Sequence, residues 1–327
     1  MKHALTVLIF ACALSFASIG AAQDPAPRVY FDTDRGPIIV ELDPVNAPIT
    51  TQNFIDYVEA GFYDGLTFHR IFNDYIIEGG EFDRNLAPRP VLFEPIESEA
   101  DNGLLNLEGT IAMANGGDPD AAQASFYFNL ADNDVLDGIY TVFGDVIAGQ
   151  STLTAIEKAA RNIDPDDGSV TSLPVSPTVI RRAVAFEGDF PVLPLHTGSW
   201  FEIDNPGVGF ALEVSKDASD ESGPIAVVYW FDFNSGQPLW LTGVTSFEYG
   251  ATSLTFDLIG ATNPGASVGF QMPPPADGFD VAGTLTVEFN GCGGGNFSYS
   301  LLDFGSGNIP VSRLTLPDSD SCAAFAD

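Results

Sequence analysis

The spacing of apolar positions changes several times between residues 28 and 187, which predicts a domain that mixes strands with a few helices. Two β-rich runs, 29–34 and 37–42, flank a turn at Arg35 and Gly36. Two such runs around a short polar turn predict a β-hairpin at the start of this domain.

Two amphipathic helices are predicted in the same half of the chain. The first begins at a threonine cap, Thr50 or Thr51, continues with apolar residues four apart, and ends at Gly61. The second covers 151–160, where three apolar residues share one face. Both helices are short, so we expect them to cover a sheet or barrel.

Residues 188–327 alternate between apolar and polar positions and have almost no helical periodicity. Leu254, Phe256 and Leu258, for example, alternate with polar neighbours, and turns rich in Gly, Asn and Pro separate such runs. About eight short strands fit, which predicts an antiparallel barrel or sandwich. The expected units are a first domain over 28–187, a linker over 188–194 and an all-β domain over 195–327.

The first 22 residues have the pattern of a leader. Lys2 and His3 form a short positive start, 5–14 is an apolar run too short to span a bilayer, and small residues end at Ala22. This predicts a signal peptide over 1–22 and a periplasmic or secreted mature protein. A retained membrane anchor is the less favoured alternative, because the apolar run is short.

The chain after the leader has two cysteines, Cys292 and Cys322. An even pair in an exported protein predicts one disulfide. Such a bond would contribute roughly 3 kcal/mol to the stability of the second domain.

The charge balance is strongly acidic, with 12 Lys and Arg against 45 Asp and Glu and a net charge of −33. Nucleic acids and anionic membrane surfaces are bound by clustered Lys and Arg, so neither is an expected partner. Cations and cationic partners suit this surface better.

A series of motifs in the first domain is the strongest functional signal. In order they are 68–71 (FHRI), 76–82 (IIEGGEF), 99–104 (EADNGL), 109–114 (GTIAMA), 125–130 (SFYFNL), 136–138 (LDG) and 140–144 (YTVFG). Their order and spacing resemble the cyclophilin-type peptidyl-prolyl isomerases of bacterial exported kind. The resemblance covers 28–187.

The resemblance implies a mainly β protein whose first domain is an eight-stranded closed barrel with two helices. It also implies rotation of X-Pro peptide bonds, without a cofactor or metal. That rotation has a barrier of about 18–20 kcal/mol and needs neither a nucleophile nor proton transfer. A cationic donor that faces the proline nitrogen favours the twisted state, and the resemblance gives this role to Arg70.

The resemblance further implies a substrate site around Arg70. The positions that match its apolar pocket for the proline ring are Tyr75, Ile76, Tyr127 and Leu136. Ala114 and Asn115 match the stretch that pairs with the backbone of the substrate. Proline-containing peptides or unfolded exported proteins are therefore the expected partners.

Several positions depart from the family pattern: Tyr75 and Tyr127 replace pocket phenylalanines, and Val135 and Tyr140 stand where the family often has Trp and His. Two further departures bear on activity. Glu78 and Ser125 stand where the family usually has glutamine. A carboxylate beside Arg70 is expected to pair with it and to reduce its pull on the proline nitrogen. Ser125 is too short for the reach of a glutamine amide. We therefore predict a weakened isomerase.

Each of these residues also has a structural interpretation. Arg70 could form an ordinary surface ion pair in so acidic a protein, and Tyr127 and Leu136 could be core residues. A metal or general-base role for His69 is disfavoured, because the family histidine beside the arginine is structural and no second histidine is near.

The sequence predicts the fold of the second domain more clearly than its function. Trp200, Trp230 and Trp240 are expected to fill its core, the alternative being a platform for glycans or peptides, and His196 is expected to be a turn residue. A different function for the whole protein is a proline-peptide-binding chaperone of low activity. In that case the β-domain would tether it to an envelope or surface partner.

Overall fold

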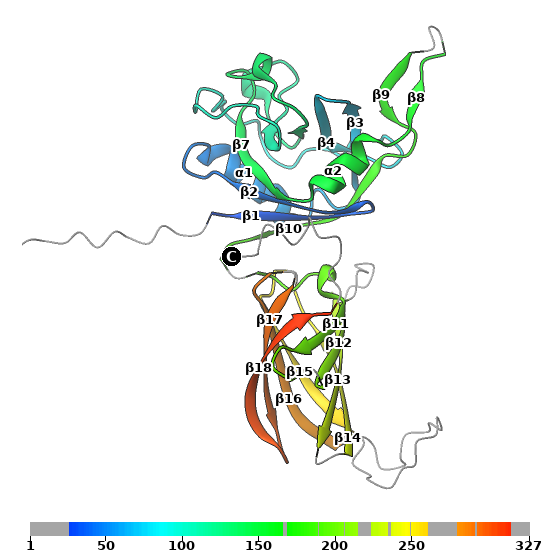
Figure 1. Ribbon diagram of the computed structural model, residues 1–327. Coiled ribbons are helices and arrows are strands. Elements are labelled where there is room, and N and C mark those ends of the chain that lie inside the picture. Colours follow the sequence, from blue (N-terminus) through cyan, green and yellow to red (C-terminus); the bar gives the residue numbers. More distant parts are fainter. Residues whose placement is uncertain are drawn as a thin grey trace, which may run out of the picture.

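The computed structural model describes residues 26–314 except 166–168, 189, 206, 215–223, 235–236, 249, 261–279 and 292. These residues form two closed β-barrels, which Figure 1 shows one above the other. The predicted fold class, mainly β with a second barrel or sandwich, is therefore confirmed. The predicted leader, Cys292 and Cys322 lie outside the described residues, and the leader and the disulfide stay predictions.

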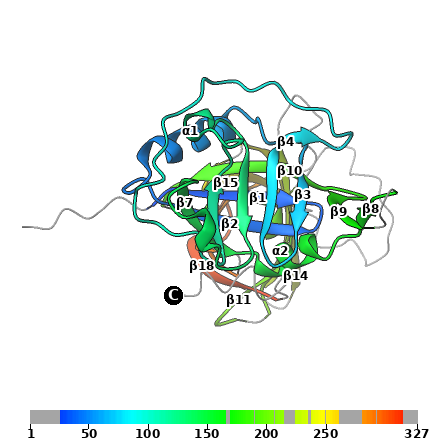
Figure 2. The same ribbon diagram turned by 90° about the horizontal axis from the view of Figure 1, so that it is seen from above.

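The first barrel is antiparallel and has the strand order β1-β10-β3-β4-β6-β5-β7-β2. Its strands are β1 (Arg28–Thr33), β2 (Gly36–Leu42), β3 (Leu66–Phe72), β4 (Ile76–Asp83), β5 (Thr110–Met113), β6 (Phe126–Asn129), β7 (Val142–Ala148) and β10 (Thr178–Phe186). The predicted hairpin is β1 and β2, in register from Arg28–Glu41 to Thr33–Gly36. A separate pair, β8 (Arg161–Ile163) and β9 (Val170–Pro174), projects from the side of this barrel (Figure 2).

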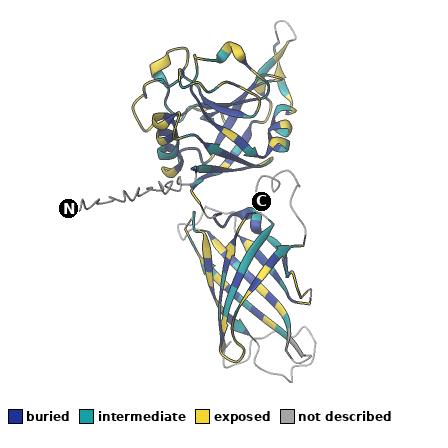
Figure 3. Ribbon diagram, turned by 60° about the vertical axis from the view of Figure 1, so that its left-hand side comes forward, coloured by how far each residue is buried: buried dark blue, intermediate teal, exposed yellow. Residues whose placement is uncertain are grey.

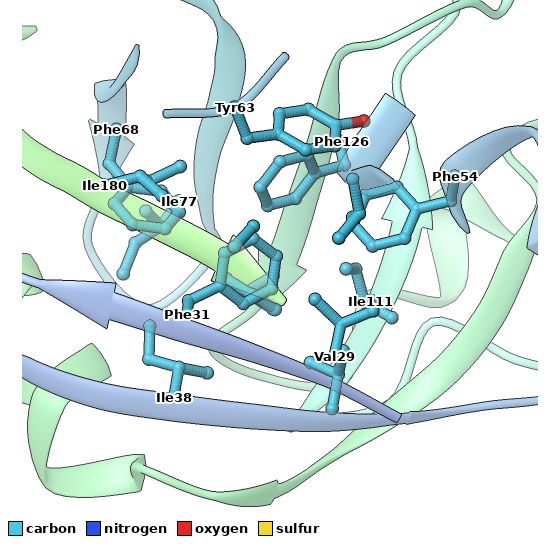
Figure 4. Close-up of a cluster of buried hydrophobic side chains, with 14 of the residues drawn as sticks. Val29, Phe31, Ile38, Phe54, Tyr63, Phe68, Ile77, Ile111, Phe126 and Ile180 are labelled. Atoms are coloured by element: carbon cyan, nitrogen blue, oxygen red, sulfur yellow. The ribbon is translucent and has the colours of Figure 1, made fainter. Parts of the chain in front are cut away.

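Aromatic side chains fill the interior of the first barrel (Figure 4). Phe31 lies at the centre, with its ring centroid 5.6 Å from that of Phe126 and 6.2 Å from that of Phe54. All three are fully buried. Burying a side chain of this size contributes about 1.5–3 kcal/mol, so this cluster holds the strands that carry the site.

The first helix, α1 (Pro48–Glu59), begins earlier than the sequence predicts. Thr50 and Thr51 lie inside it, and neither is its cap, which corrects the prediction. Instead, the carboxylate of Glu99 accepts hydrogen bonds from the backbone N–H groups of Ile49 and Thr50, at 3.0 and 2.8 Å. Free N–H groups of a first turn favour a negative charge, so a distant glutamate replaces the local cap.

The end of the first helix and the bounds of the second agree more closely with the predictions. Gly61 has φ of +64° and follows α1 as predicted. The second helix, α2 (Gln150–Glu157), lies within one residue of its predicted start and ends three residues early. The part of the chain that the structure describes also has three 3₁₀ turns: η1 (Pro119–Ala121), η2 (Asp134–Leu136) and η3 (Pro194–His196). No helix within the described residues has the length and hydropathy that a membrane span requires.

The second barrel is an up-and-down meander in which each strand pairs with the next and the last with the first. Its strands are β11 (Gly198–Glu202), β12 (Gly209–Val214), β13 (Ile225–Asn234), β14 (Gln237–Ser246), β15 (Ser253–Gly260), β16 (Asp280–Phe289), β17 (Gly294–Leu301) and β18 (Gly305–Arg313). Buried and exposed residues alternate along these strands (Figure 3). Trp200 and Trp230 are buried as predicted, but the prediction for Trp240 is wrong, because 67% of it is exposed.

The segment between the barrels packs against both of them. Phe190 and Leu193 are buried in one cluster with Tyr30 and Ile39 of the first barrel. Phe190 also forms a bridge with Phe289 of the second barrel. Residues 190–194 of the segment expected as a linker are therefore buried.

Candidate active site

Strands β3 and β4 place Arg70 and Glu78 directly opposite each other. In β3 the neighbours of Arg70 are buried while Arg70 points outward, as a strand with one face on a core requires. Arg70 Nη1 lies 3.1 Å from Glu78 Oε2, and the two side chains are 48% and 13% exposed. The predicted pairing of these two residues is therefore present.

Two glycines allow β4 to pack closely behind this pair. A Cβ on Gly79 would lie 2.8 Å from the ring of Phe68. Gly80 has φ of +88°, and a Cβ there would lie 2.9 Å from the carbonyl oxygen of Ala124. Side chains rarely adopt this conformation, so the GG pair of the motif is needed for packing rather than for binding a phosphate.

Arg70 lines a cavity of about 440 Å³ whose wall includes several aromatic and aliphatic side chains. Of the residues predicted for substrate binding, Tyr75, Ile76, Glu78, Ala114, Tyr127 and Leu136 line it together with Arg70. Phe72, Gly116, Gly117 and Tyr140 complete the lining and were not assigned to the site from the sequence. The chain thus brings a cation and an apolar pocket together at one place.

Phe72 could have been found from strand periodicity alone. It lies two residues after Arg70, on the same face of β3. The Arg70 guanidinium carbon is 4.8 Å from the centroid of the Phe72 ring. This cation–π contact, together with Glu78, holds the guanidinium at the edge of the cavity.

Asn115 and Ser125 do not line this cavity, and their role in substrate binding stays a prediction. They line a neighbouring cavity of about 420 Å³, and Glu78, Ala114 and Gly116 are shared by the two cavities. The Asn115 side chain donates to the carbonyl of Ile139 at 3.1 Å and accepts from the N–H of Gly117 at 3.0 Å. Its amide is therefore used to shape the loop.

The phenol of Tyr127 has a partner beneath the cavity. Its hydroxyl donates to Asn106 Oδ1 at 2.7 Å, and Asn129 Nδ2 donates to the same oxygen at 3.2 Å. Burial, followed by the nearby Tyr140, raises the pKa of the Tyr127 phenol far above its ordinary value. Tyr127 is therefore neutral, and it presents a ring to the cavity and a hydroxyl to a buried polar network.

A second group of ionisable residues lies behind Glu78. Burial lowers the pKa of His69, against an opposing effect of Glu78. Burial, and then Glu78, raise the pKa of Glu81, against an opposing hydrogen bond from Ser125. Ser125 Oγ donates to Glu81 Oε2 at 3.4 Å. Ser125 thus contacts Glu81 rather than Arg70.

The arrangement is suited to holding a small ring against a cation. The described residues of the larger cavity supply aromatic and aliphatic surface, and Arg70 supplies a planar fork of N–H donors. Such a site can stabilise developing electron density on a substrate atom without covalent chemistry.

Comparison with known proteins gives consistent matches for this half of the chain. The family model "Cyclophilin type peptidyl-prolyl cis-trans isomerase/CLD" matches residues 28–184. The sequence is 35% identical to peptidyl-prolyl cis-trans isomerase A of Dickeya dadantii over 188 residues, which cover 56% of this chain and 96% of that protein. It is also 35% identical to peptidyl-prolyl cis-trans isomerase B of Escherichia coli, with 45% and 99% covered.

A solved structure is similar to the same region. It is a cyclophilin type peptidyl-prolyl cis-trans isomerase of Cryptosporidium parvum in the presence of the dipeptide Ala-Pro. Its TM-score is 0.42 and its sequence identity 23%, with 48% of this chain and 97% of that chain covered.

Proposed function

We propose that this chain, which belongs to the cyclophilin-type peptidyl-prolyl cis-trans isomerase family, rotates X-Pro bonds of exported proteins. We further propose that Glu78 lowers the rate of this reaction. The isomerase activity follows from the family. The exported substrates and the reduced rate are the proposal. The observation that carries it is the Arg70–Glu78 ion pair at the edge of the apolar cavity.

Rotation of the peptide bond removes its conjugation and leaves a lone pair on the proline nitrogen. In the proposed mechanism the apolar wall, including Ile76 and Leu136, holds the proline ring, while Arg70 donates toward that nitrogen. The donor interacts with the twisted state more strongly than with the planar one, so the barrier falls. No covalent intermediate and no proton transfer are required.

Glu78 reduces this effect because it competes for the same donors. Its carboxylate accepts a hydrogen bond from Arg70 Nη1, and it is much less exposed than the arginine. A guanidinium that already faces a carboxylate offers less positive charge to the proline nitrogen. Ser125 does not offset this, since its hydroxyl bonds to Glu81.

The test is a prolyl isomerisation assay on a proline tetrapeptide, comparing the protein without its leader with Arg70→Ala and Arg70→Lys. We expect kcat/KM to fall by about 100-fold in Arg70→Ala and less in Arg70→Lys, which keeps the charge but loses the fork of donors. An Arg70→Ala protein that is folded and retains full activity would refute the role of Arg70.

The exported location rests on the pattern of residues 1–22. Expression of the full chain in a bacterium followed by fractionation tests it. We expect a shortened protein, beginning at Gln23, in the periplasm or medium. Full-length protein retained in the cytoplasm would contradict the proposal.

A second candidate function is a proline-peptide-binding chaperone, which the pairing of Arg70 with Glu78 favours because it occupies the donor. The second barrel would then supply attachment to an envelope or surface partner such as a glycan. Its outer face carries Phe231 and Trp240, with ring centroids 5.2 Å apart and Trp240 67% exposed. Peptide binding without turnover, and cell-wall binding that Trp240→Ala abolishes, would select this candidate.

A further inference from the structure

We propose that His69, Glu78 and Glu81 form a binding site for a zinc-class divalent cation next to the isomerase centre. One ring nitrogen of His69 and one carboxylate oxygen of each glutamate all lie within 4.8 Å of one another. These are the ligand types that zinc and similar transition metals take in proteins.

The imidazole is the strongest indication of a ligand. His69 is only 6% exposed, and its Nδ1 has no hydrogen-bond partner among the described residues. A buried polar atom without a partner is costly, and native proteins rarely leave one. A cation bound at Nδ1 would remove that cost.

The two carboxylates give the site its charge and its access. Glu78 and Glu81 lie on β4, and both line the cavity of about 420 Å³, so an ion from solvent can reach them. Ionised together beside a neutral imidazole, they would supply two negative charges, which match a divalent cation. Ligand atoms around tetrahedral zinc lie about 3.4 Å apart, given bonds of ~2.1 Å, so small rotations of the glutamate side chains would close the site.

Arg70 is the competing cation at this place. Its guanidinium already contacts Glu78 at 3.1 Å. Coordination of Glu78 by a metal would weaken that contact and leave more of the guanidinium facing the larger cavity. The sequence disfavours a metal role for His69 because no second histidine lies near it, and the two glutamates come next to His69 only through the pairing of β3 with β4.

Metal type follows from the ligands. Calcium prefers six to eight oxygen ligands and magnesium an octahedral shell of oxygens, and neither favours imidazole. We therefore expect zinc and cobalt to bind and calcium not to displace them. The chain has three histidines. His3 lies in the predicted leader and His196 is fully buried in the second barrel, so any imidazole ligation is expected to come from His69.

The experiment is calorimetric titration of Zn²⁺ into the leader-free protein, prepared without a histidine tag, in excess Ca²⁺. We expect one Zn²⁺ per chain for the unchanged protein and an affinity at least about tenfold lower for Glu81→Gln. The control Glu59→Gln removes an exposed carboxylate from α1 and should leave the affinity unchanged. Equal affinities for Glu81→Gln and the unchanged protein, or no stoichiometric binding, would overturn the site.

A visible spectrum with Co²⁺ identifies the ligands independently. Nitrogen and oxygen ligation gives d–d bands without the sulfur-to-metal charge transfer that bound cysteines would add, and these bands should disappear in Glu81→Gln. The effect on turnover rests on the proposed function: Zn²⁺ should raise kcat/KM in the unchanged protein and not in Glu81→Gln. Because metal binding is measured without substrate, the titration still tests the metal site if the isomerase proposal fails.

Discussion

Arg70 Nη1 and Glu78 Oε2 lie 3.1 Å apart across two paired strands, at the edge of an apolar cavity. A cross-strand pair of this kind is stabilised by the sheet itself, because the register places the two Cβ atoms opposite each other. The ion pair therefore exists before any substrate arrives, and a substrate has to compete with it for the guanidinium.

Replacing Glu78 with glutamine should raise the activity. Glutamine keeps the shape and one acceptor oxygen but removes the charge that holds Arg70. Partly exposed ion pairs contribute about 0.2–1 kcal/mol, so we expect kcat/KM for a proline tetrapeptide to rise by a factor of about 1.4 to 5. An unchanged or lower value would show that the pair does not restrain the arginine.

Replacing Tyr127 with phenylalanine separates the ring from its hydroxyl. The ring lines the cavity, while the hydroxyl bonds to Asn106 at 2.7 Å. Asn106 keeps its bond from Asn129, so the loss should be about 1 kcal/mol of unfolding free energy, with kcat/KM nearly unchanged. Calorimetric unfolding and the peptide assay measure the two effects. A large loss of activity would instead give the hydroxyl a direct role.

Gly80→Ala and Gly103→Ala form a matched pair that separates backbone strain from steric overlap. Both glycines have positive φ, +88° and +83°, but a Cβ on Gly103 has nothing within 4 Å, whereas one on Gly80 meets Ala124 and Phe126. We expect Gly103→Ala to cost about 1 kcal/mol and Gly80→Ala about 2 kcal/mol more. Similar losses in urea unfolding of the two variants would mean that close packing at Gly80 contributes little.

Local patterns predicted much of this molecule. The alternation in 253–260 became strand β15, and the hairpin around Gly36 and the approximate positions of both helices were right. The pairing of Arg70 with Glu78 was also right, because the two residues lie in neighbouring motifs, 68–71 and 76–82, which form the adjacent strands β3 and β4. Such features depend on residues close in sequence, where periodicity and turn residues are informative.

Features that depend on distant contacts were missed or wrong. Glu99 caps α1 from 49 residues away, which no cap rule based on neighbouring residues can find. The outward direction of Trp240 follows from the register of β13 with β14, and alternation alone does not say which face of a long strand is inside.

His196 gives the second barrel a dependence on pH. It was expected to be a turn residue, and it does end the short turn η3, but it is also fully buried. Its Nδ1 accepts from the N–H of Leu193 at 2.9 Å, which leaves Nε2 as the donor to the carbonyl of Gly291 at 3.2 Å. The ring also stacks on Phe289 with centroids 3.8 Å apart. The fold therefore holds the neutral tautomer.

Burial lowers the pKa of His196 from 6.5 to about 3. Between these two values the unfolded chain binds one proton more than the folded barrel, so the unfolding free energy falls as the pH falls. We expect a loss of about 1.4 kcal/mol per pH unit from this residue between pH 6 and 4.

All three tryptophans lie in the second barrel, so their fluorescence during urea unfolding reports on it alone. His196→Phe keeps a ring on Phe289 but cannot titrate; it should be less stable at pH 7 and should lose less stability on acidification. Because the carboxylates contribute equally to both proteins, parallel pH profiles would show that His196 is not the source of the dependence.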